Sequence, residues 1–293
     1  MELIKSKIKS KIKLDNENNI FKEQIEYVML DGKMLRGIIT LSICNNINYA
    51  LIVEYIHNSS LIIDDMPCMD NDDQRRNKLS AHKKYGENKA LLLSSTLLVN
   101  ALQNLNICIK ELDKPIINIL NNEINNEINN LITGQYMDIN KDMTYVSNLK
   151  SMPPRLQKKN ILKLIKYKTG SLFSLAILLG YIGKYKKIDE YNDLNNIKKI
   201  GICFGLCFQI LDDLADYYNE NENKNINIKT YFTKNELIDL FSDNIDYFRN
   251  TLIDYKLYNK ILNDLYLYLL KEFKARMCPR HACAQGTHSP KVK

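Results

Sequence analysis

Hydrophobic residues recur at helical spacing along most of the chain. Ile4, Ile8 and Ile12 lie four residues apart among lysines, which predicts an amphipathic first helix over Met1–Lys13. The same spacing predicts two helical stretches within Phe21–Tyr49, helices over Ala50–Met66, Ala90–Leu112, Ile116–Ile132 and Ile197–Tyr218, an apolar run over Ile161–Gly183 that is interrupted at Tyr167–Ser171, and two or three helices within Lys234–Arg276. No segment alternates convincingly between polar and apolar positions as a strand does, so the predicted fold class is all-α.

Polar segments separate the predicted helices. The clearest break is Asn140–Pro154, which ends on two consecutive prolines and which we do not interpret as a domain boundary. Asn219–Asn227 is a charged, asparagine-rich loop. From residue 277 to residue 293 the periodicity is lost, and this segment holds two prolines, two cysteines and two of the four histidines. We interpret residues 277–293 as a disordered tail or a cloning or frameshift scar.

Composition narrows the class of protein. The 293 residues are enough for one large domain or two small ones, and the low counts of glycine and proline, 10 and 6, favour a helical protein over a sandwich or barrel. The net charge of +7 is modest for this length, and we find no clustered basic face or nucleic-acid-binding motif, so no nucleic-acid partner is predicted. Part of the positive charge can attract anionic substrates.

The cysteines and the N-terminal region bear on cellular location. The seven cysteines form no spaced metal motif, and Cys203 and Cys207 have the spacing of side chains that pack on one helix face. We find no secretory signal, and a transit peptide is disfavoured because acidic residues begin at Glu2 and no arginine precedes Arg36. The predicted location is the cytoplasm, with the interior of a plastid or another organelle as the alternative. The longest apolar stretch, Ser171–Gly183, is too short to span a bilayer.

Two clusters of acidic residues carry candidate chemistry. The first, Ile62–Arg76, reads IIDDMPCMDNDDQRR, in which five aspartates end an apolar helix and two arginines follow. The second, Phe208–Asp216, reads FQILDDLAD on another apolar segment. Carboxylates at this density repel one another unless a cation lies among them. Because Mg²⁺ takes one or two carboxylates and completes its shell with water and phosphate oxygens, the clusters predict a metal–diphosphate site.

A basic motif precedes the first acidic cluster. DGKMLRG, Asp31–Gly37, places Lys33 and Arg36 three residues apart, so on a helical turn they face the same way. This arrangement is typical of an exposed helix N-terminus, and it equally suits a clamp for an anion.

Together, these motifs resemble those of the trans-isoprenyl diphosphate synthases, most closely the bacterial and plastid geranylgeranyl/farnesyl diphosphate synthase branch. DDMPCMDNDDQRR is similar to the family's first aspartate-rich motif in its DDxxxxD form, FQILDDLAD to its second, DDxxD, motif, and DGKMLRG to its GGKRLRP. The motifs follow the family order, and the likeness covers residues 20–276. It implies a single-domain helical bundle of the isoprenoid synthase type, over residues 1–276, around a central apolar cavity.

The resemblance implies a role for each motif residue. Asp64, Asp70 and Asp212 would bind Mg²⁺, with three ions expected and Mn²⁺ possible. Supporting positions in the two acidic motifs are Asp65, Asp213 and Asp216. The residues implied to contact the allylic diphosphate or to line the cleft near the metals are Arg75, Lys168, Thr169, Gln209, Gln135 and Asp138, with Lys224 and Lys229 from the loop after the second motif.

A second set of residues is implied to hold isopentenyl diphosphate: Lys33, Arg36, His57 and Arg76. His57 lies two helical turns before Asp64, on the face that would point into the cleft. The chain departs from the commonest family pattern at Met34, Gly37 and Asn77, where an arginine, a proline and a glycine are usual.

The implied reaction is head-to-tail prenyl transfer between isopentenyl diphosphate and an allylic diphosphate, with no histidine or glutamate base. Ser59 and Ser60 lie about one helical turn before Asp64. Family members that stop at fifteen carbons often carry an aromatic residue at one of these positions. The two serines therefore predict an open pocket and a twenty-carbon product, with fifteen carbons as the alternative.

Other classes of protein carry related motifs. Class I terpene cyclases share DDxxD, but they usually have an NSE/DTE second motif and lack the isopentenyl-binding bases. Regulatory subunits of heteromeric synthases have degraded aspartate motifs, although Cys203 and Cys207 form a CxxxC pattern like one found in such heteromers. A helical scaffold protein would need neither acids nor bases at these spacings. The resemblance implies a homodimer as the oligomeric state.

Overall fold

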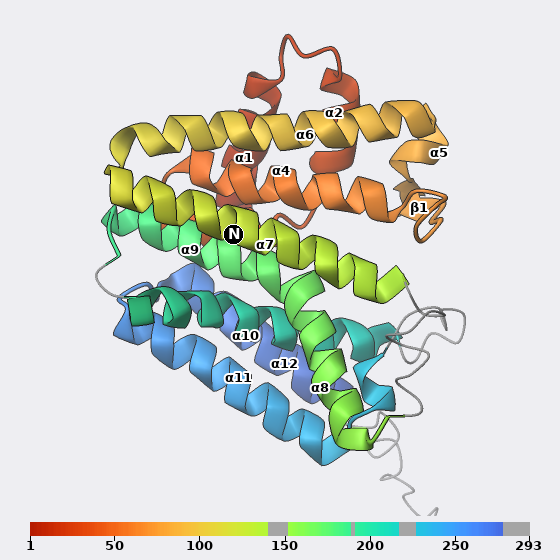
Figure 1. Ribbon diagram of the computed structural model, residues 1–293, viewed down its shortest axis with the longest axis vertical. Coiled ribbons are helices and arrows are strands. Elements are labelled where there is room, and N and C mark those ends of the chain that lie inside the picture. The colour runs from red at the N-terminus through yellow and green to blue at the C-terminus, as the bar shows by residue number, and fades with distance from the viewer. Residues whose placement is uncertain (140–151, 189–190, 217–226, 278–293) are drawn as a thin grey trace, which may run out of the picture.

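The computed structural model describes residues 1–139, 152–188, 191–216 and 227–277, and Figure 1 shows that they form stacked helices. The first helices along the chain are α1 (Glu2–Asp15), α2 (Lys22–Met29), α3 (Leu35–Cys44), α4 (Ile47–Asp64), α5 (Ala81–Tyr85), α6 (Glu87–Cys108) and α7 (Lys114–Ile139). They are followed by α8 (Pro154–Ile165), α9 (Ser171–Tyr185), α10 (Tyr191–Asp216), α11 (Lys234–Asp254) and α12 (Lys260–Met277). Short helical turns are η1 (Ile109–Glu111), η2 (Lys166–Gly170) and η3 (Ile228–Thr230). The all-α prediction is confirmed.

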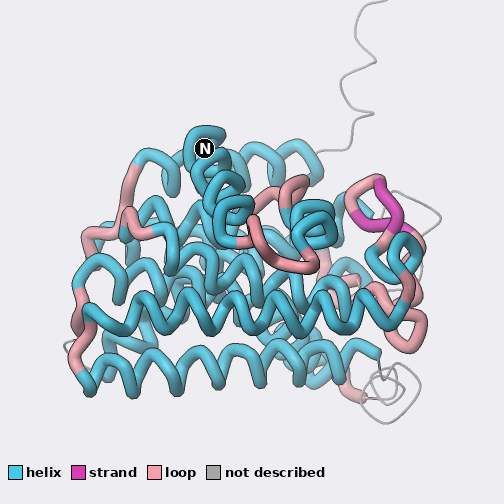
Figure 2. Tube along the Cα trace, turned by 90° about the horizontal axis from the view of Figure 1, so that it is seen from above, coloured by secondary structure: helices cyan, strands magenta, loops and turns pink. Residues whose placement is uncertain are grey.

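The most apolar helix, α9, lies at the centre of the bundle. All of its residues from Ser171 to Gly183 are buried, as expected for a helix that is hydrophobic on every side. Helices α3, α4, α7 and α10 pack against it, α6 covers α4, and α11 covers α10. The long helices run side by side when the molecule is viewed from above (Figure 2).

The asparagine-rich helix is longer than its isoleucine repeat predicts. Helix α7 continues through the GQYMD segment to Ile139. Ile124 faces the core, whereas Ile132 is 61% exposed. The buried Glu127 of this helix pairs with Lys198 of α10 at 2.9 Å, so part of the contact between α7 and α10 is ionic.

A small hairpin corrects the prediction that the chain has no strand. Strands β1 (Gln74–Arg75) and β2 (Lys78–Leu79) pair antiparallel, with Gln74 opposite Leu79. Two residues per strand are too few to show alternation in the sequence. The turn residues Arg76 and Asn77 have φ values of 55° and 60°, the left-handed conformation that two-residue hairpin turns of this type require. Asparagine adopts this conformation more readily than most residues other than glycine.

Among the described residues, α6 and the turn after it (residues 87–111) form the one helical stretch long and apolar enough to cross a bilayer by length and composition. A helix packed within a folded domain can pass the same test, and 44% of its most apolar window is buried in the fold. Residues 219–226 of the charged loop, including Lys224, and the segment from residue 278 onward lie outside the described residues.

Candidate active site

A cavity of about 660 Å³ opens between α3, α4, the hairpin, α7, η2, α9 and α10. It brings together most of the charged residues that the motifs singled out. The predicted site residues that line it are Lys33, Arg36, His57, Ser60, Asp64, Arg75, Arg76, Lys168, Thr169, Gln209 and Asp212. Its apolar walls come from Leu35, Leu61, Leu131, Leu172 and Phe208, with Met34.

The first acidic motif lies where α4 ends. Pro67 cannot continue the helix, and the chain folds back so that the N–H of Asp70 donates to the carbonyl of Asp64 at 2.9 Å. Burial raises the pKa of Asp64 to about 6, and the charges of Asp70 and Asp65 act in the same direction, against Lys168 and Arg75. A carboxylate that is this costly to ionise alone is suited to a site where a cation joins it.

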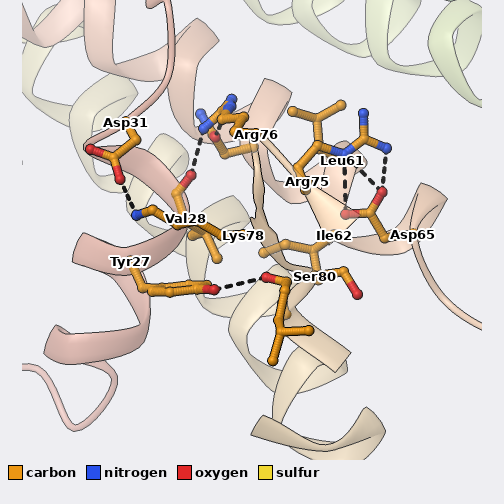
Figure 3. A pocket seen from close by; sticks show the side chains of 13 residues that line it. Tyr27, Val28, Asp31, Leu61, Ile62, Asp65, Arg75, Arg76, Lys78 and Ser80 are labelled. Atoms are coloured by element: carbon orange, nitrogen blue, oxygen red, sulfur yellow. Dashed lines mark hydrogen bonds and ion pairs between the residues drawn. The ribbon is translucent and has the colours of Figure 1, made fainter. Parts of the chain in front are cut away.

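Asp65 points away from the cavity and holds Arg75. The Asp65 side chain is buried, and Nε of Arg75 donates to its two oxygens at 2.9 and 3.2 Å. Figure 3 shows this pair beside a small pocket of about 30 Å³ under the hairpin. Asp65 thus positions Arg75, and its supporting role at the metal site stays a prediction.

Arg36, His57 and Arg76 line the cavity together, and we call these three bases the cradle. Arg36 Nη1 donates to Nε2 of His57 at 3.0 Å, and its guanidinium lies 4.3 Å from the centre of the Phe173 ring. Burial lowers the pKa of Arg36 to about 10. Burial and the charges of Arg36 and Arg76 lower the pKa of His57 well below its ordinary value, so His57 is a neutral acceptor for Arg36 at neutral pH.

The hairpin turn positions Arg76, the third base. Its guanidinium donates to the carbonyl of Val28 at 2.7 Å and to Oδ1 of Asn58 at 3.2 Å (Figure 3 shows the Val28 contact). It also lies against Gly32, where an added Cβ would come within 3.0 Å of Nη1. A glycine at position 32 therefore lets the guanidinium approach the backbone of the basic motif.

Lys168 and Thr169 reach the cavity from a π-helical turn. The interruption that the sequence pattern shows at Tyr167–Ser171 is this turn, η2, which lies between α8 and α9. It packs directly on α7, because a Cβ on Gly134 would lie 2.5 Å from the Lys168 nitrogen. Single π turns inside helices occur frequently at functional sites. Lys168 forms an ion pair with Asp138, which is buried on α7.

A chain of hydrogen bonds fixes the second acidic motif. Thr169 Oγ1 donates to Oε1 of Gln209 at 2.7 Å, and Nε2 of Gln209 donates to Oδ1 of Asp213 at 2.7 Å. Asp213 also accepts the Ile228 N–H at 2.7 Å, which ties the end of α10 to η3. Asp212 is thus held beside the cavity, whereas Asp213 is buried behind it. For Asp216 the structure describes the backbone at the end of α10.

The chain is similar to proteins of a known family. The sequence matches the Polyprenyl synthetase family over residues 18–235. The chain belongs to the polyprenyl synthetase family. Geranylgeranyl pyrophosphate synthase 4 of Arabidopsis thaliana is 30% identical over 232 residues, which cover 75% of this chain and 59% of that protein. Heterodimeric geranylgeranyl pyrophosphate synthase large subunit 2 of the same plant is 31% identical over 209 residues, covering 68% of this chain and 53% of that protein. The chain therefore spans less than two thirds of these curated relatives.

Solved structures share the fold. A geranyltranstransferase from Thermotoga maritima superposes with a TM-score of 0.70 at 24% identity, covering 94% of this chain and 98% of that one. An FPP/GFPP synthase from Zymomonas mobilis superposes with a TM-score of 0.72 at 23% identity, covering 92% and 96%. These likenesses establish the all-α fold of this family member.

The donor set of this polyprenyl synthetase family member fits a cation that shares its shell with substrate. Among the described residues, no three His, Cys, Asp or Glu side chains converge as a closed metal site. Mg²⁺ characteristically uses one or two carboxylates and takes its other ligands from water and phosphate. Asp64 and Asp212, the two carboxylates of the acidic motifs that line the cavity, match that number of protein ligands.

Some predicted residues lie away from the cavity. Ser59 is buried against α6, where Oγ donates to the carbonyl of Ser94 at 3.0 Å. Lys229 lines a separate pocket with Lys234 and Arg276. Gln135 and Asp138 are buried on α7 without contributing to the cavity lining.

Glu54, a buried carboxylate on α4 that contacts α3, was not among the residues predicted from the sequence. Its position one helical turn before His57 is a signal that could have identified it, because charged residues are rarely buried on an apolar helix without a partner. The aromatic support of Arg36 by Phe173 was not predicted either.

Proposed function

We propose that this protein is a prenyltransferase that condenses isopentenyl diphosphate with an allylic diphosphate (dimethylallyl, geranyl or farnesyl) to give a longer trans-polyprenyl diphosphate. Geranylgeranyl diphosphate is the favoured product and farnesyl diphosphate the alternative. The observation that supports this best is that Asp64 and Asp212 line one cavity together with the bases Lys33, Arg36 and Arg76.

We assign the two ends of the cavity to the two substrates. Lys168, Thr169, Gln209 and Arg75 would hold the allylic diphosphate. The isopentenyl diphosphate would lie on Lys33, Arg36 and Arg76, with His57 orienting Arg36. Mg²⁺, which this family generally uses, would be held by Asp64, Asp70 and Asp212. When bound, it would neutralise charge on the departing diphosphate.

The protein would orient the two substrates and exclude water from the reacting atoms. Holding both diphosphates on fixed bases would bring the allylic carbon and the isopentenyl double bond into contact. Leu131, Leu172 and Phe208 would exclude water from the allylic cation, which water would otherwise capture. The double bond would attack that cation, and the proton then lost would pass to the departing diphosphate. None of these steps needs the neutral His57 as a base.

The cavity suggests which serine bears on product length. Ser60 lines the cavity and donates to the carbonyl of His57 at 2.9 Å. Ser59 is occupied with Ser94 on α6, with their hydroxyl oxygens 2.8 Å apart. We therefore propose that Ser60, more than Ser59, keeps the pocket open for a twenty-carbon chain.

The partner we propose is a second copy of the chain. Helix α6 carries a stripe of apolar side chains that α4 does not cover: Leu91, Leu92, Leu98, Val99 and Leu102 are 40% to 58% exposed. A continuous apolar face on a long helix suits a self-complementary contact about a two-fold axis. Light scattering should give a dimer for the wild type and a monomer for Leu102→Glu. A wild type that is monomeric at micromolar concentration would contradict the homodimer.

We also infer that residues 1–276 work as one synthase domain in the cytoplasm or inside an organelle. The relatives include geranylgeranyl pyrophosphate synthase 3 of A. thaliana, which is named chloroplastic. A fragment truncated after residue 276 should keep full activity.

Product analysis tests the proposed function. The purified protein would be incubated with Mg²⁺, isopentenyl diphosphate and each allylic primer in turn, and the dephosphorylated products identified by mass spectrometry. The proposal expects elongation by five-carbon units up to twenty carbons. A cyclised hydrocarbon from the primer alone would indicate a cyclase, and no product with any primer would favour a regulatory subunit.

A further inference from the structure

Glu54 is a buried acid to which the proposed reaction gives no role. Its side chain is 2% exposed and lies on α4, one turn before His57. Oε1 accepts the backbone N–H of Gly37 at 2.7 Å. The charges of Arg36 and Arg76 also act on it and oppose the rise in its pKa that burial causes. Glu54 thus lies near enough to Arg36 and Arg76 for their charges to act on it.

Helix α3 lacks a cap of its own. Met34 stands at its N-cap position with φ of 55° and makes no side-chain hydrogen bond to the first turn. The first N–H groups of a helix need an acceptor, and a negative charge near them is favourable. Glu54 supplies the acceptor from the neighbouring helix. Since Arg36 is the second residue of α3, the same contact fixes the turn from which Arg36 reaches the cavity.

Gly37 permits this contact. A Cβ at position 37 would lie 2.8 Å from Cγ of Glu54 and 3.3 Å from Oε1, so a side chain there would push the carboxylate away. The glycine also keeps the N–H that donates to Glu54, which a proline at this position would lack.

We propose that Glu54 is a positioning residue for the isopentenyl diphosphate cradle: its hydrogen bond to the first turn of α3 sets the direction of Arg36. The inference rests on the proposed function. It concerns one substrate, because the side-chain hydrogen bond of Glu54 within the described part of the chain goes to Gly37 of α3. Loss of the contact should therefore weaken the binding of isopentenyl diphosphate and leave the binding of the allylic substrate unchanged.

Three variants test this role. Glu54→Leu removes the acceptor, Glu54→Gln keeps an acceptor without the charge, and Gly37→Ala keeps the charge but displaces the carboxylate. Glu54→Leu and Gly37→Ala should each raise the KM for isopentenyl diphosphate about ten-fold, the usual effect of losing one buried hydrogen bond to a charged group. The KM for the allylic diphosphate should change less than about two-fold, and Glu54→Gln should change either constant less than about three-fold.

If Glu54 had a purely structural role, its loss would lower the melting temperature and change the KM values for the two substrates by the same factor. If Glu54→Leu fails to fold, Gly37→Ala decides the question. Equal changes in both constants for the folded variants, or a Glu54→Gln defect as large as that of Glu54→Leu, would overturn the proposal.

Binding of inorganic diphosphate in EDTA, measured by calorimetry, separates this inference from the proposed function. Without metal, diphosphate can bind the bases at either end of the cavity, so the comparison is made in a Lys168→Ala background that weakens the allylic end. There, Gly37→Ala should weaken binding about ten-fold whatever the reaction is. Unchanged diphosphate binding by Gly37→Ala would contradict the positioning role even if prenyl transfer were established.

Discussion

Asp64 on α4 and Asp212 on α10 line the same cavity, although they come from opposite halves of the chain. Their common placement depends on α9, which packs against both helices and holds them on either side of the apolar walls. A diphosphate in this cavity would lie between two acidic motifs and a set of bases. This relationship between Asp64 and Asp212 underlies the proposed chemistry.

The pair formed by Asp65 and Arg75 should affect binding more than turnover. Asp65→Asn removes the charge that fixes the Arg75 guanidinium, so we expect the KM for the allylic diphosphate to rise about ten-fold with kcat nearly unchanged. Steady-state kinetics measure both. Asp72→Asn is the matched control, because Asp72 lies 3.5 Å from Arg75 with its side chain 49% exposed, and exposed pairs contribute little. A loss of kcat in Asp65→Asn as large as that in Asp64→Asn would instead make Asp65 a metal ligand.

The contact between α7 and the π turn should tolerate no side chain. Gly134→Ala would place a Cβ 2.5 Å from the Lys168 nitrogen and 2.8 Å from its Cα. Backbone atoms cannot move aside cheaply, so the free energy of unfolding should fall by about 1–3 kcal/mol, measured by urea denaturation. Gly170→Ala, in the π turn itself, is the control because its nearest neighbour would be 3.6 Å away. Equal stability of the two variants would show that η2 does not depend on close packing.

The two serines before the first acidic motif should behave differently. Ser60→Phe places a ring in the cavity and should shift the product from twenty to fifteen carbons. Ser59→Phe should instead disturb the contact with Ser94 and lower the free energy of unfolding by about 1–3 kcal/mol, leaving the product length unchanged. Chromatography of the dephosphorylated products distinguishes these outcomes. If Ser59→Phe shortened the product and Ser60→Phe did not, the prenyl chain would grow along the side of α4 that faces α6, which would contradict the prediction.

His57 should make the folded protein less stable in acid. Its pKa is lowered by burial and by Arg36 and Arg76, so the folded protein resists a proton that the unfolded chain binds below about pH 6.5. Stability is therefore lost as the pH falls from about 7 to 5, with a contribution of up to about 1.4 kcal/mol per pH unit. Urea denaturation of wild type and His57→Gln across this range measures the difference. The wild type should lose stability more steeply, and parallel curves would contradict the prediction.

The helices and the acidic motifs could be predicted from the sequence, because both depend on residues close together in the chain. The apolar run of α9 predicts a buried helix by itself, and the proline after Asp65 predicts where α4 ends. The density of carboxylates in the motifs predicts a metal–diphosphate site. The role of each residue at that site came from the family resemblance, since spacing within a motif says nothing of the distance between motifs.

Other features depend on contacts between distant segments and leave little trace in the sequence. The hairpin at Arg76 is too short to show alternation. Ser59 points toward α6 and Ser60 toward the cavity because of how α6 packs on α4. The sequence alone does not reveal this packing. The role of Glu54 required knowing that Gly37 lies against it, 17 residues away in the chain.

Metal-dependent binding of an allylic diphosphate tests the central relationship most directly. Calorimetry with a non-hydrolysable allylic thiodiphosphate would compare the wild type, Asp64→Asn, Asp212→Asn and the exposed control Asp73→Asn, with Mg²⁺ and with EDTA. We expect Mg²⁺ to strengthen binding of the thiodiphosphate by the wild type and by Asp73→Asn. In Mg²⁺, the affinity of Asp64→Asn and of Asp212→Asn should each be at least about one hundred-fold lower than that of the wild type. Wild-type affinity in either Asp64→Asn or Asp212→Asn would contradict a diphosphate held jointly by the two acidic motifs.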